Sequence, residues 1–425
     1  MAKPILLNSA AELLERILSG KMPADRQMEG YFRAHRDMGV RDRGFVAETV
    51  YGCLREKRLL EHIAGNALLL DVVAAYLLTH GYSARALEES GFRGDAREMV
   101  ERARTLEKSS LPFAIQTNMP DWLAQRLRAQ FGDTEALTLS LALNQPAPMD
   151  LRVNTLKAKR EEVQARLAGE GFPCLPTPYS ATGLRRNERA SVFKTQCFKE
   201  GFFEVQDEGS QLISLMLEPK RQEMVVDFCA GAGGKTLYIG ALMANTGTVY
   251  AFDVLAKRLD KLKPRLRRAG LDNVRMVAIS HERDARVQRL KGKIDRVLVD
   301  APCSGTGTLR RNPDIKWREI DLPELADMQQ RILAAAAELV KPGGRLVYAT
   351  CSLLREENED VVEKFLSAHP GFSVVPAGEI LARRHVPLTM NDAALRLYPH
   401  RHHTDGFYAV ALERKQGNVP IRMAR

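Results

Sequence analysis

From residue 224 onward, short apolar runs alternate with amphipathic segments, and this alternation limits the chain to a small set of folds. The apolar runs are MVVDF, VYAFDV, VRMVAIS, RVLVDAP and RLVYATC, at 224–228, 249–254, 274–280, 296–302 and 345–351. The segments between them have helical spacing, most clearly at 234–244, 256–270 and 325–340. Apolar strands separated by helices are typical of a parallel sheet with helices on both faces. We therefore expect an α/β fold with a doubly wound, Rossmann-like sheet.

The rest of the chain divides where the pattern changes. Residues 1–145 carry apolar residues at helical spacing with few β-branched runs, which predicts an all-helical domain. The proline-rich stretch NQPAPM at 144–149 marks its end. Strand and helix patterns then predict a small α/β subdomain over 146–205, the large sheet domain over 206–415 and a tail over 416–425.

The composition is that of an ordinary soluble globular protein, with 45% hydrophobic and 27% charged residues. The six cysteines form no CxxC pair, and the histidines at 400, 402 and 403 have no cysteine or carboxylate at ligand spacing. Neither a metal site nor a disulfide framework is predicted. The N-terminus lacks an export signal, and the longest apolar stretch, 68–78, is interrupted by Asp71 and too short to cross a bilayer. We expect a cytoplasmic monomer with no metal and no membrane partner.

The net charge of +10 belongs to the second part of the chain. Residues 1–145 hold 19 basic and 19 acidic residues, so the whole excess follows them. A basic excess suggests a polyanionic substrate such as a nucleic acid. The segment 256–270 alone holds seven basic residues against one acid, although such a run is more often a solvated helix face. Charge by itself leaves the partner open.

Two cysteines lie directly after two of the predicted strands. Cys303 stands in DAPCSGTG at 300–307 and Cys351 in YATCSLLREENE at 348–359. The carboxyl ends of parallel strands open on one edge of a sheet, so the two thiols can meet in one pocket. A thiolate adds readily to an electron-poor carbon. Either cysteine alone would be interpreted as a small buried side chain, but the pair indicates a reactive site.

A glycine loop, DFCAGAGGKT at 227–236, follows the first strand of the sheet and opens a helix. It lacks the spacing of a P-loop and the register of a pyrophosphate-binding GxGxxG. Asp253 lies at the end of the next strand, where an acid can accept both hydroxyls of a ribose. A nucleoside without a pyrophosphate fits S-adenosylmethionine better than NAD. Asp227 is then placed to meet either the amino-acid end of that cofactor or the facing backbone amides.

A thiol pair and a methyl donor together suggest methylation of a pyrimidine at C5. That carbon is a weak nucleophile until a thiolate adds at C6, and the target base must leave its stack to be reached. Asp300, three residues before Cys303, is our candidate for holding the base through N3 and the exocyclic amine.

The sequence resembles the bacterial RNA (cytosine-5)-methyltransferases, in particular the branch that modifies small-subunit ribosomal RNA and carries an N-terminal NusB-type domain. The segments that carry the resemblance are 151–157, 205–212, 227–236, 252–259, 300–317, 348–362 and 403–412. The helical domain matches over 40–60 and 119–127. The resemblance implies a NusB-like docking or RNA-binding domain before the Rossmann-like methyltransferase domain.

The resemblance also implies roles for particular residues. It makes Cys351 the nucleophile and assigns Cys303 to product release, a choice that spacing alone leaves open. With Asp227 and Gly231 from the loop, the implied cofactor-binding residues are Asp227, Cys229, Ala230, Gly231, Gly233, Gly234, Lys235, Asp253, Arg258 and Asp300. Pro302, Arg310, Arg311 and Asn312 are expected to contact the RNA. The contact to adenine falls on either Glu282 or Asp284.

Two further expectations concern a group of three glutamates and one tryptophan. Glu356, Glu357 and Glu359 are expected to open a helix, where acids favour the N-terminal dipole. Trp317 is expected to lie in a core rather than to serve as a stacking platform.

The target itself stays open at this point. The expected activity is methyl transfer to a cytosine in small-subunit ribosomal RNA. Transfer RNA or large-subunit ribosomal RNA, as naked RNA or in an assembling particle, are alternatives. A non-catalytic RNA-binding assembly factor is a further alternative, although it needs neither the thiol pair nor the glycine loop. A dehydrogenase is disfavoured because it has no use for two thiols in the pocket.

Overall fold

The computed structural model describes residues 4–186, 191–390 and 392–416, and the chain forms two compact units. One unit contains the residues up to Pro146 together with Thr308–Ile320. The other contains Ala147–Gly307 and the residues from Asp321 onward. The tail expected over 416–425 lies outside the described residues except for its first position.

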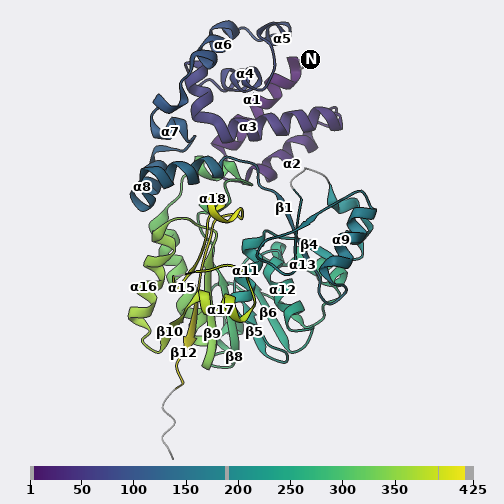
Figure 1. The fold of residues 1–425 in the computed structure, drawn as a ribbon, viewed down its shortest axis with the longest axis vertical. Coiled ribbons are helices and arrows are strands. Elements are labelled where there is room, and N and C mark those ends of the chain that lie inside the picture. The colour runs from purple at the N-terminus through teal and green to yellow at the C-terminus, as the bar shows by residue number, and fades with distance from the viewer. Residues whose placement is uncertain (1–3, 187–190, 391, 417–425) are drawn as a thin grey trace, which may run out of the picture. The chain divides into compact units, whose positions relative to one another are not determined.

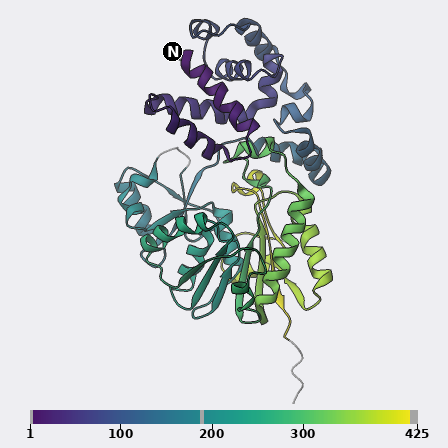
Figure 2. The same cartoon turned by 180° about the vertical axis from the view of Figure 1, so that it is seen from behind.

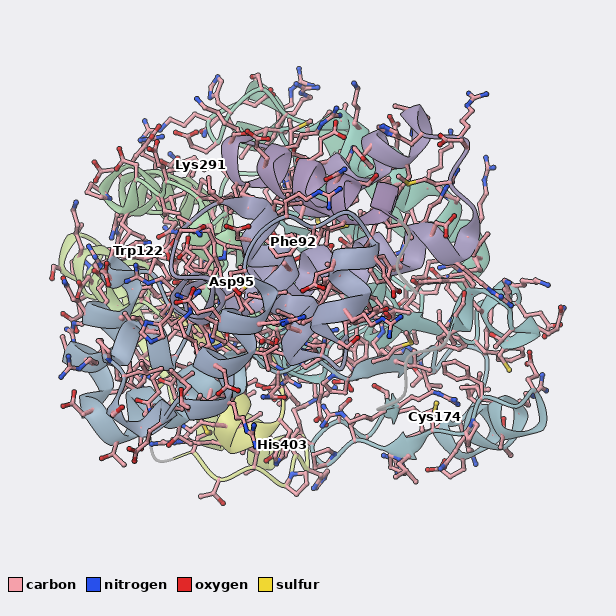
Figure 3. All side chains as sticks on the ribbon, turned by 90° about the horizontal axis from the view of Figure 1, so that it is seen from above. Phe92, Asp95, Trp122, Cys174, Lys291 and His403 are labelled. Atoms are coloured by element: carbon pink, nitrogen blue, oxygen red, sulfur yellow. The ribbon has the colours of Figure 1, made fainter. Side chains whose placement is uncertain are left out.

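The first unit is helical, as expected from the pattern of residues 1–145 (Figure 1). Its helices are α1 (Pro4–Ser19), α2 (Ala24–Ala34), α3 (Val40–Ala64), α4 (Leu69–Thr79), α5 (Ala84–Glu89), α6 (Ala96–Thr105), α7 (Phe113–Gln116) and α8 (Asp121–Leu143), with short 3₁₀ turns at η1 (Lys108–Ser110) and η4 (Pro313–Trp317). Buried faces of α1, α3 and α4 form its core. Phe92 joins that core, and Asp95 caps α6 by accepting a hydrogen bond from the Glu98 amide (Figure 3).

Gly132 interrupts helix α8, and a second helical segment follows it at once. The glycine has φ 73° and ψ 165°, so the run Asp121–Leu143 is two helical pieces joined at a kink. A positive φ suits glycine because it has no side chain to clash.

Residues 308–320 belong to the helical unit, although the sequence places them within the domain over 206–415. Lys316 is buried there and donates hydrogen bonds to the carbonyls of Arg55 and Asn118 and to the side-chain oxygen of Asn144, at 2.8, 2.7 and 2.9 Å. Trp317 packs against the core of this unit and donates its indole N–H to the Leu54 carbonyl, at 2.7 Å. Trp317 is therefore partly buried against the core of this unit.

The second unit begins with the small α/β subdomain. Its antiparallel sheet has the strand order β2-β3-β1-β4, from β1 (Met149–Val153), β2 (Leu175–Pro176), β3 (Gly183–Arg186) and β4 (Phe203–Val205). The accompanying helices are α9 (Arg160–Gly169) and α10 (Gln196–Lys199), with a 3₁₀ turn at η2 (Val192–Lys194). Leu151, Val163 and Phe203 lie in its own small core.

The large sheet has the order β10-β12-β9-β8-β5-β6-β7, and β11 pairs with β12. Its strands are β5 (Met224–Asp227), β6 (Thr248–Asp253), β7 (Val274–Ala278), β8 (Ile294–Asp300), β9 (Val340–Thr350), β10 (Phe372–Val375), β11 (Leu395–Leu397) and β12 (Phe407–Arg414). The five strands from β5 to β9 are parallel, as the sequence predicts. The sheet continues beyond that prediction, because β12 inserts antiparallel between β9 and β10.

Helices cover both faces of this sheet (Figures 1 and 2). The helices of this domain are α11 (Glu208–Met216), α12 (Gly234–Leu242), α13 (Ala256–Ala269), α14 (Ala285–Gln288), α15 (Leu322–Leu339), α16 (Glu359–Ala368), α17 (Ala377–Arg383) and α18 (Pro399–His402), with 3₁₀ turns at η3 (Thr306–Thr308) and η5 (Arg355–Glu357). Val226 faces the core formed with α15 and α16, whereas its neighbour Val225 faces the core with α11 and α12. The strands are continuously apolar because both faces are buried.

Within the described residues, no single helix is long and apolar enough to span a membrane. Only helices α3 and α4 taken together have the length and apolar composition of such a span, and the chain bends by 98° between them.

Candidate active site

Four neighbouring parallel strands bring their carboxyl ends to one cavity of about 600 Å³. Asp227 ends β5, Asp253 ends β6, Asp300 ends β8, and Cys351 follows Thr350 at the end of β9. The chain passes from β5 outward to β6 and β7, then returns to β8 on the other side of β5. This reversal makes the β5–β8 boundary a topological switch point, where open α/β sheets bind their ligands.

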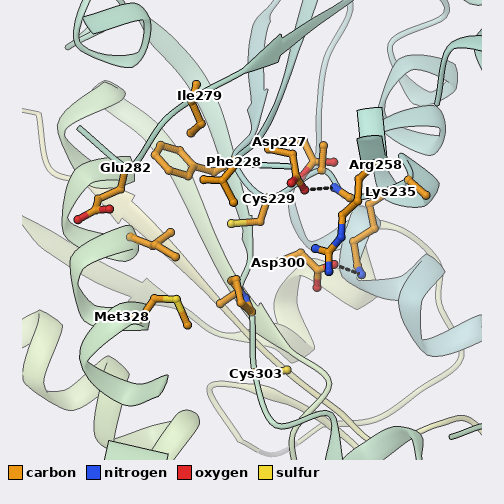
Figure 4. A pocket seen from close by; sticks show the side chains of 18 of the residues that line it. Asp227, Phe228, Cys229, Lys235, Arg258, Ile279, Glu282, Asp300, Cys303 and Met328 are labelled. Atoms are coloured by element: carbon orange, nitrogen blue, oxygen red, sulfur yellow. Dashed lines mark hydrogen bonds and ion pairs between the residues drawn. The ribbon is translucent and has the colours of Figure 1, made fainter. Parts of the chain in front are cut away.

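Most of the residues that the sequence assigns to the cofactor and the reaction line this cavity (Figure 4). They are Asp227, Cys229, Ala230, Gly231, Gly234, Lys235, Asp253, Arg258, Asp300, Pro302, Cys303 and Cys351. Sequence reasoning missed the other lining residues Gln206, Ser210, Phe228, Ala232, Val254, Ile279, Ser280, His281, Ala301, Met328, Arg331 and Ile332. Gln206 and Ser210 lie in the segment 205–212, whose resemblance to the family was the available signal.

The glycine loop runs from the end of β5 to the start of α12. Gly231 has φ 58°, and its amide donates a hydrogen bond to an Asp253 carboxylate oxygen at 2.9 Å. Gly233 has φ 83° and does not line the cavity. A Cβ atom on Gly233 would lie 2.2 Å from Leu262 of α13, so this glycine allows the helix to pack against the loop.

Arg152, from the small subdomain, supports the same loop. It is buried, donates to the Gly234 carbonyl at 2.7 Å and to the Gln206 side chain, and lies over the Tyr238 ring. Burial lowers the pKa of Arg152 to about 10. The small subdomain therefore holds the first turn of α12 in place.

Asp227 is buried behind the loop with one oxygen engaged and the other without a partner. Its Oδ2 accepts a hydrogen bond from the Thr236 hydroxyl at 2.6 Å, whereas Oδ1 is buried and unpaired. Burial, and secondarily the nearby Asp300 carboxylate, raise the pKa of Asp227 to about 7. A buried oxygen without a partner is costly unless a ligand donates to it.

The donor set and the shape of the cavity fit S-adenosylmethionine. Asp253 stands at the end of β6, where ribose-binding acids lie, and the cationic amino-acid end of the cofactor can supply the donor that Asp227 Oδ1 lacks. Apolar side chains such as Ile279 and Ile332 line a wall for a nucleobase.

Of the two candidates for the adenine contact, Glu282 lines the cavity and Asp284 does not. Asp284 instead caps the short helix α14 and accepts hydrogen bonds from the Ser280 amide and hydroxyl. Hydrogen bonds from the Arg286 side chain and from the Ser280 and Arg286 backbone amides hold the pKa of Asp284 well below its usual value.

The two cysteines meet in the cavity, as their positions after strands predict. The Cys303 and Cys351 sulfur atoms are 3.4 Å apart. The hydrogen bond that the Cys303 thiol donates to the Cys351 sulfur, together with burial, raises the pKa of Cys303 well above its usual value. Cys303 is therefore held as a neutral thiol when Cys351 carries negative charge.

Lys235 and Asp300 form an ion pair beside the cysteines, with Nζ 2.7 Å from Oδ2 (Figure 4). Burial alone would lower the pKa of Lys235, but Asp300, and to a smaller extent Cys351, raise it above its usual value. The site therefore holds a cation, a carboxylate and two sulfurs within one pocket.

Arg310, Arg311 and Asn312 lie in the segment that belongs to the helical unit and do not line the cavity. The Arg310 carbonyl accepts a hydrogen bond from Arg55 at 3.2 Å. Within the described residues, no group of three histidines, cysteines or carboxylates is arranged to hold a metal ion.

Comparison with known proteins decides the family. Residues 214–413 match the model of the 16S rRNA methyltransferase RsmB/F family, and residues 119–192 match the ferredoxin-like domain of RsmF/B-like methyltransferases. The probable ribosomal RNA small subunit methyltransferase B of Synechocystis is 35% identical, with 88% of this chain and 91% of that protein covered. The chain belongs to this family.

Two further proteins extend the comparison. The 28S rRNA (cytosine-C(5))-methyltransferase of Mus musculus is 33% identical over 77% of this chain and 43% of that protein. The crystal structure of PH0851 superimposes with a TM-score of 0.79, at 28% identity, over 97% of this chain and 99% of that one. As a member of the RsmB/F family, this chain is an RNA methyltransferase.

Proposed function

We propose that this enzyme methylates C5 of a cytosine in small-subunit ribosomal RNA through a covalent bond between Cys351 and C6 of the base. The observation that carries the proposal is the thiol pair, with two sulfurs 3.4 Å apart beside the Lys235–Asp300 ion pair. A methyltransferase that acts on a nucleophilic nitrogen or oxygen needs no thiol. Methylation at C5 of a pyrimidine does, because that carbon becomes nucleophilic only after addition at C6.

The cofactor is held by the glycine loop and the acids around it. We assign its amino-acid end to Asp227, its ribose to Asp253 and its adenine to the wall that includes Glu282. Cys229, Ala230, Gly231, Gly234 and Arg258 complete this part of the cavity, and Gly233 supports the loop. When bound there, S-adenosylmethionine supplies an electrophilic methyl group directed at the base.

Cys351 opens the reaction by adding its sulfur to C6. The electron pair of the C5–C6 double bond then becomes available at C5, and Lys235 balances the charge of the attacking thiolate. Asp300 accepts a hydrogen bond from the exocyclic amine and so orients the ring. Pro302, next to Cys303 in the cavity wall, is assigned to the base, and Arg310, Arg311 and Asn312 to the RNA backbone.

Release of the product reverses the addition. A general base takes the proton from C5, and the electron pair of the C–H bond restores the C5–C6 double bond. The bond between C6 and sulfur breaks with its electron pair on sulfur, which regenerates the Cys351 thiolate. Cys303 lies next to that sulfur and is assigned to this step. The helical unit is assigned to docking on the RNA or on the assembling particle.

The test is methyl transfer from labelled cofactor to ribosomal RNA and partly assembled subunits from cells that lack the enzyme. Wild type is expected to form 5-methylcytosine, Cys351→Ala to be inactive, and Cys303→Ala to accumulate a protein–RNA adduct. Activity in Cys351→Ala would show that the nucleophile is assigned wrongly. Mapping the label identifies the RNA, and a label on transfer RNA or the large subunit would replace the proposed target. No transfer to any RNA would favour an assembly factor without catalytic activity.

A further inference from the structure

A buried carboxylate lies beneath both cysteines. Glu357 is fully buried in the short turn η5, two residues before α16 begins. The sequence suggested a helix-opening role for Glu356, Glu357 and Glu359. For Glu357 this interpretation is wrong, because α16 starts at Glu359 and the Glu357 side chain points into the protein.

Four donors surround the Glu357 carboxylate. Oε1 accepts from the Ser304 amide at 2.7 Å and from the Gln329 side chain at 3.1 Å. Oε2 accepts from the hydroxyls of Ser304 and Ser352, each at 2.5 Å. Both oxygens are therefore satisfied, and each of the two serines directly follows one of the cysteines of the site.

Further hydrogen bonds from Gln329 and Asn358 fix the backbone on both sides of the two thiols. Gln329, from α15, also donates to the carbonyl of Pro302, the residue before Cys303, at 2.9 Å. Asn358, next to Glu357, donates to the Ser352 carbonyl at 3.0 Å and accepts from Thr350, the residue before Cys351, at 2.5 Å. The turn at Glu357 and Asn358 thus holds the residues on both sides of Cys351 and the residue after Cys303, and Gln329 holds the residue before Cys303.

The donors to this carboxylate are all neutral groups. Among the described residues, no lysine or arginine pairs with Glu357, so the buried charge has only hydrogen bonds to compensate for its lost hydration. An uncharged side chain could join the two loops at a lower desolvation cost. The charge also adds to the hydrogen bond that Cys303 donates to Cys351, and to burial, in raising the pKa of Cys303, which keeps the proton on that thiol.

We propose that Glu357 is a positioning residue that fixes the Cys303 and Cys351 thiols against each other through the serine that follows each cysteine. Without this carboxylate the two loops lose their common acceptor, and the separation of 3.4 Å between the sulfurs is no longer imposed. The inference deepens the proposed function, since it assumes that both thiols act on one base, but the geometry of the thiol pair can be measured without RNA.

Phenylarsine oxide is a suitable probe because its arsenic atom binds two thiols at once only when they lie close together. The full-length protein is treated with the arsenical and then with N-ethylmaleimide, and alkylation of Cys303 and Cys351 is quantified separately by peptide mass spectrometry. Wild type is expected to show joint protection of both cysteines. Glu357→Ala is expected to need at least about tenfold more arsenical, the equivalent of one lost hydrogen bond to a charged group.

Two variants separate the loss of these hydrogen bonds from the loss of a negative charge. Glu357→Gln is expected to keep most of the protection, because the serine hydroxyls can turn from donors to acceptors of the new amide. Glu363→Gln removes an exposed carboxylate from α16 and is the control for charge alone. Cofactor affinity should stay within about threefold of wild type in Glu357→Ala if only the thiols move, while the turnover rate of methyl transfer falls.

The outcomes distinguish this inference from the proposed function. Undiminished joint protection in Glu357→Ala overturns the positioning role, whatever the methyl-transfer assay shows. Loss of protection in Glu357→Ala, in an enzyme whose wild type methylates no RNA, supports the positioning role and contradicts the function. If Glu357→Ala does not fold, the double variant Ser304→Ala/Ser352→Ala decides. Loss of joint protection then supports the role, and full retention overturns it.

Discussion

Lys235 Nζ and Asp300 Oδ2 lie 2.7 Å apart, and this pair connects the cofactor loop to the strand that leads to Cys303. Lys235 stands in the first turn of α12, whereas Asp300 ends β8. The contact therefore crosses the switch point of the sheet and places a cation within the field of Cys351.

Loss of this cation should weaken nucleophilic attack. We expect Lys235→Met to lower the rate of adduct formation with RNA that carries 5-fluorocytidine by about 100-fold or more near pH 7, because the attacking thiolate loses its counter-charge. The rate should recover partly as the pH rises. Lys364→Met, which alters an exposed lysine of α16, is the control. An unchanged rate in Lys235→Met would mean that another group stabilises the thiolate.

The raised pKa of Asp227 makes a prediction about stability. Between its ordinary pKa, about 3.9, and its native value of about 7, the folded protein keeps a proton that the unfolded chain releases. Unfolding therefore releases a proton in this window, and the contribution of Asp227 to stability decreases as the pH rises.

Comparison with Asp227→Asn isolates this contribution. From pH 5 to pH 7.5, wild type without cofactor should lose on the order of 1–3 kcal/mol relative to Asp227→Asn in urea unfolding. Asp327→Asn, at an exposed position on α15, should track wild type. Parallel curves for wild type and Asp227→Asn would show that Asp227 is ionised throughout.

Glu282 and Asp284 should differ in what their substitution changes. Glu282→Gln is expected to weaken S-adenosylmethionine binding about tenfold, because Glu282 lines the cavity and a charged hydrogen bond is lost. Asp284→Asn should lower the melting temperature instead, since Asp284 caps α14 and bonds Ser280. Isothermal titration calorimetry and thermal melts of both variants check this, and a reversed pattern would move the adenine contact to Asp284.

Lys316 is expected to stabilise the helical unit. Burial lowers the pKa of Lys316 well below its usual value, and its side-chain nitrogen donates hydrogen bonds to three oxygen acceptors. Lys316→Met leaves those acceptors without a donor and should cost on the order of 2–4 kcal/mol.

Tryptophan fluorescence measures that loss selectively. The chain has two tryptophans, Trp122 and Trp317, and both belong to the helical unit. Urea unfolding followed by this signal should shift to lower denaturant in Lys316→Met and stay unchanged in Lys108→Met, at an exposed position of the same unit. Equal midpoints for the two variants would show that the buried lysine contributes no stability.

Strand and helix order was readable from the sequence because it depends on local pattern. The apolar runs ending at Asp227, Asp253 and Asp300 are short, flanked by helical segments and terminated by acids, so both the parallel sheet and the edge that holds its ligands followed from them. The convergence of Cys303 and Cys351 followed for the same reason, since both come directly after strands of that sheet.

Long-range packing decided the rest. Local pattern does not show that β12 inserts antiparallel beside β9, because an apolar run reads the same in either direction. It does not show that 308–320 leaves the sheet domain for the helical unit, which depends on the acceptors that Lys316 finds there. Nor does it distinguish Glu357 from its neighbour Glu356, since only the folded chain brings the serines after both cysteines to a single carboxylate. Sequence determined which groups reach the edge of the sheet, and tertiary structure determined which distant residues hold them there.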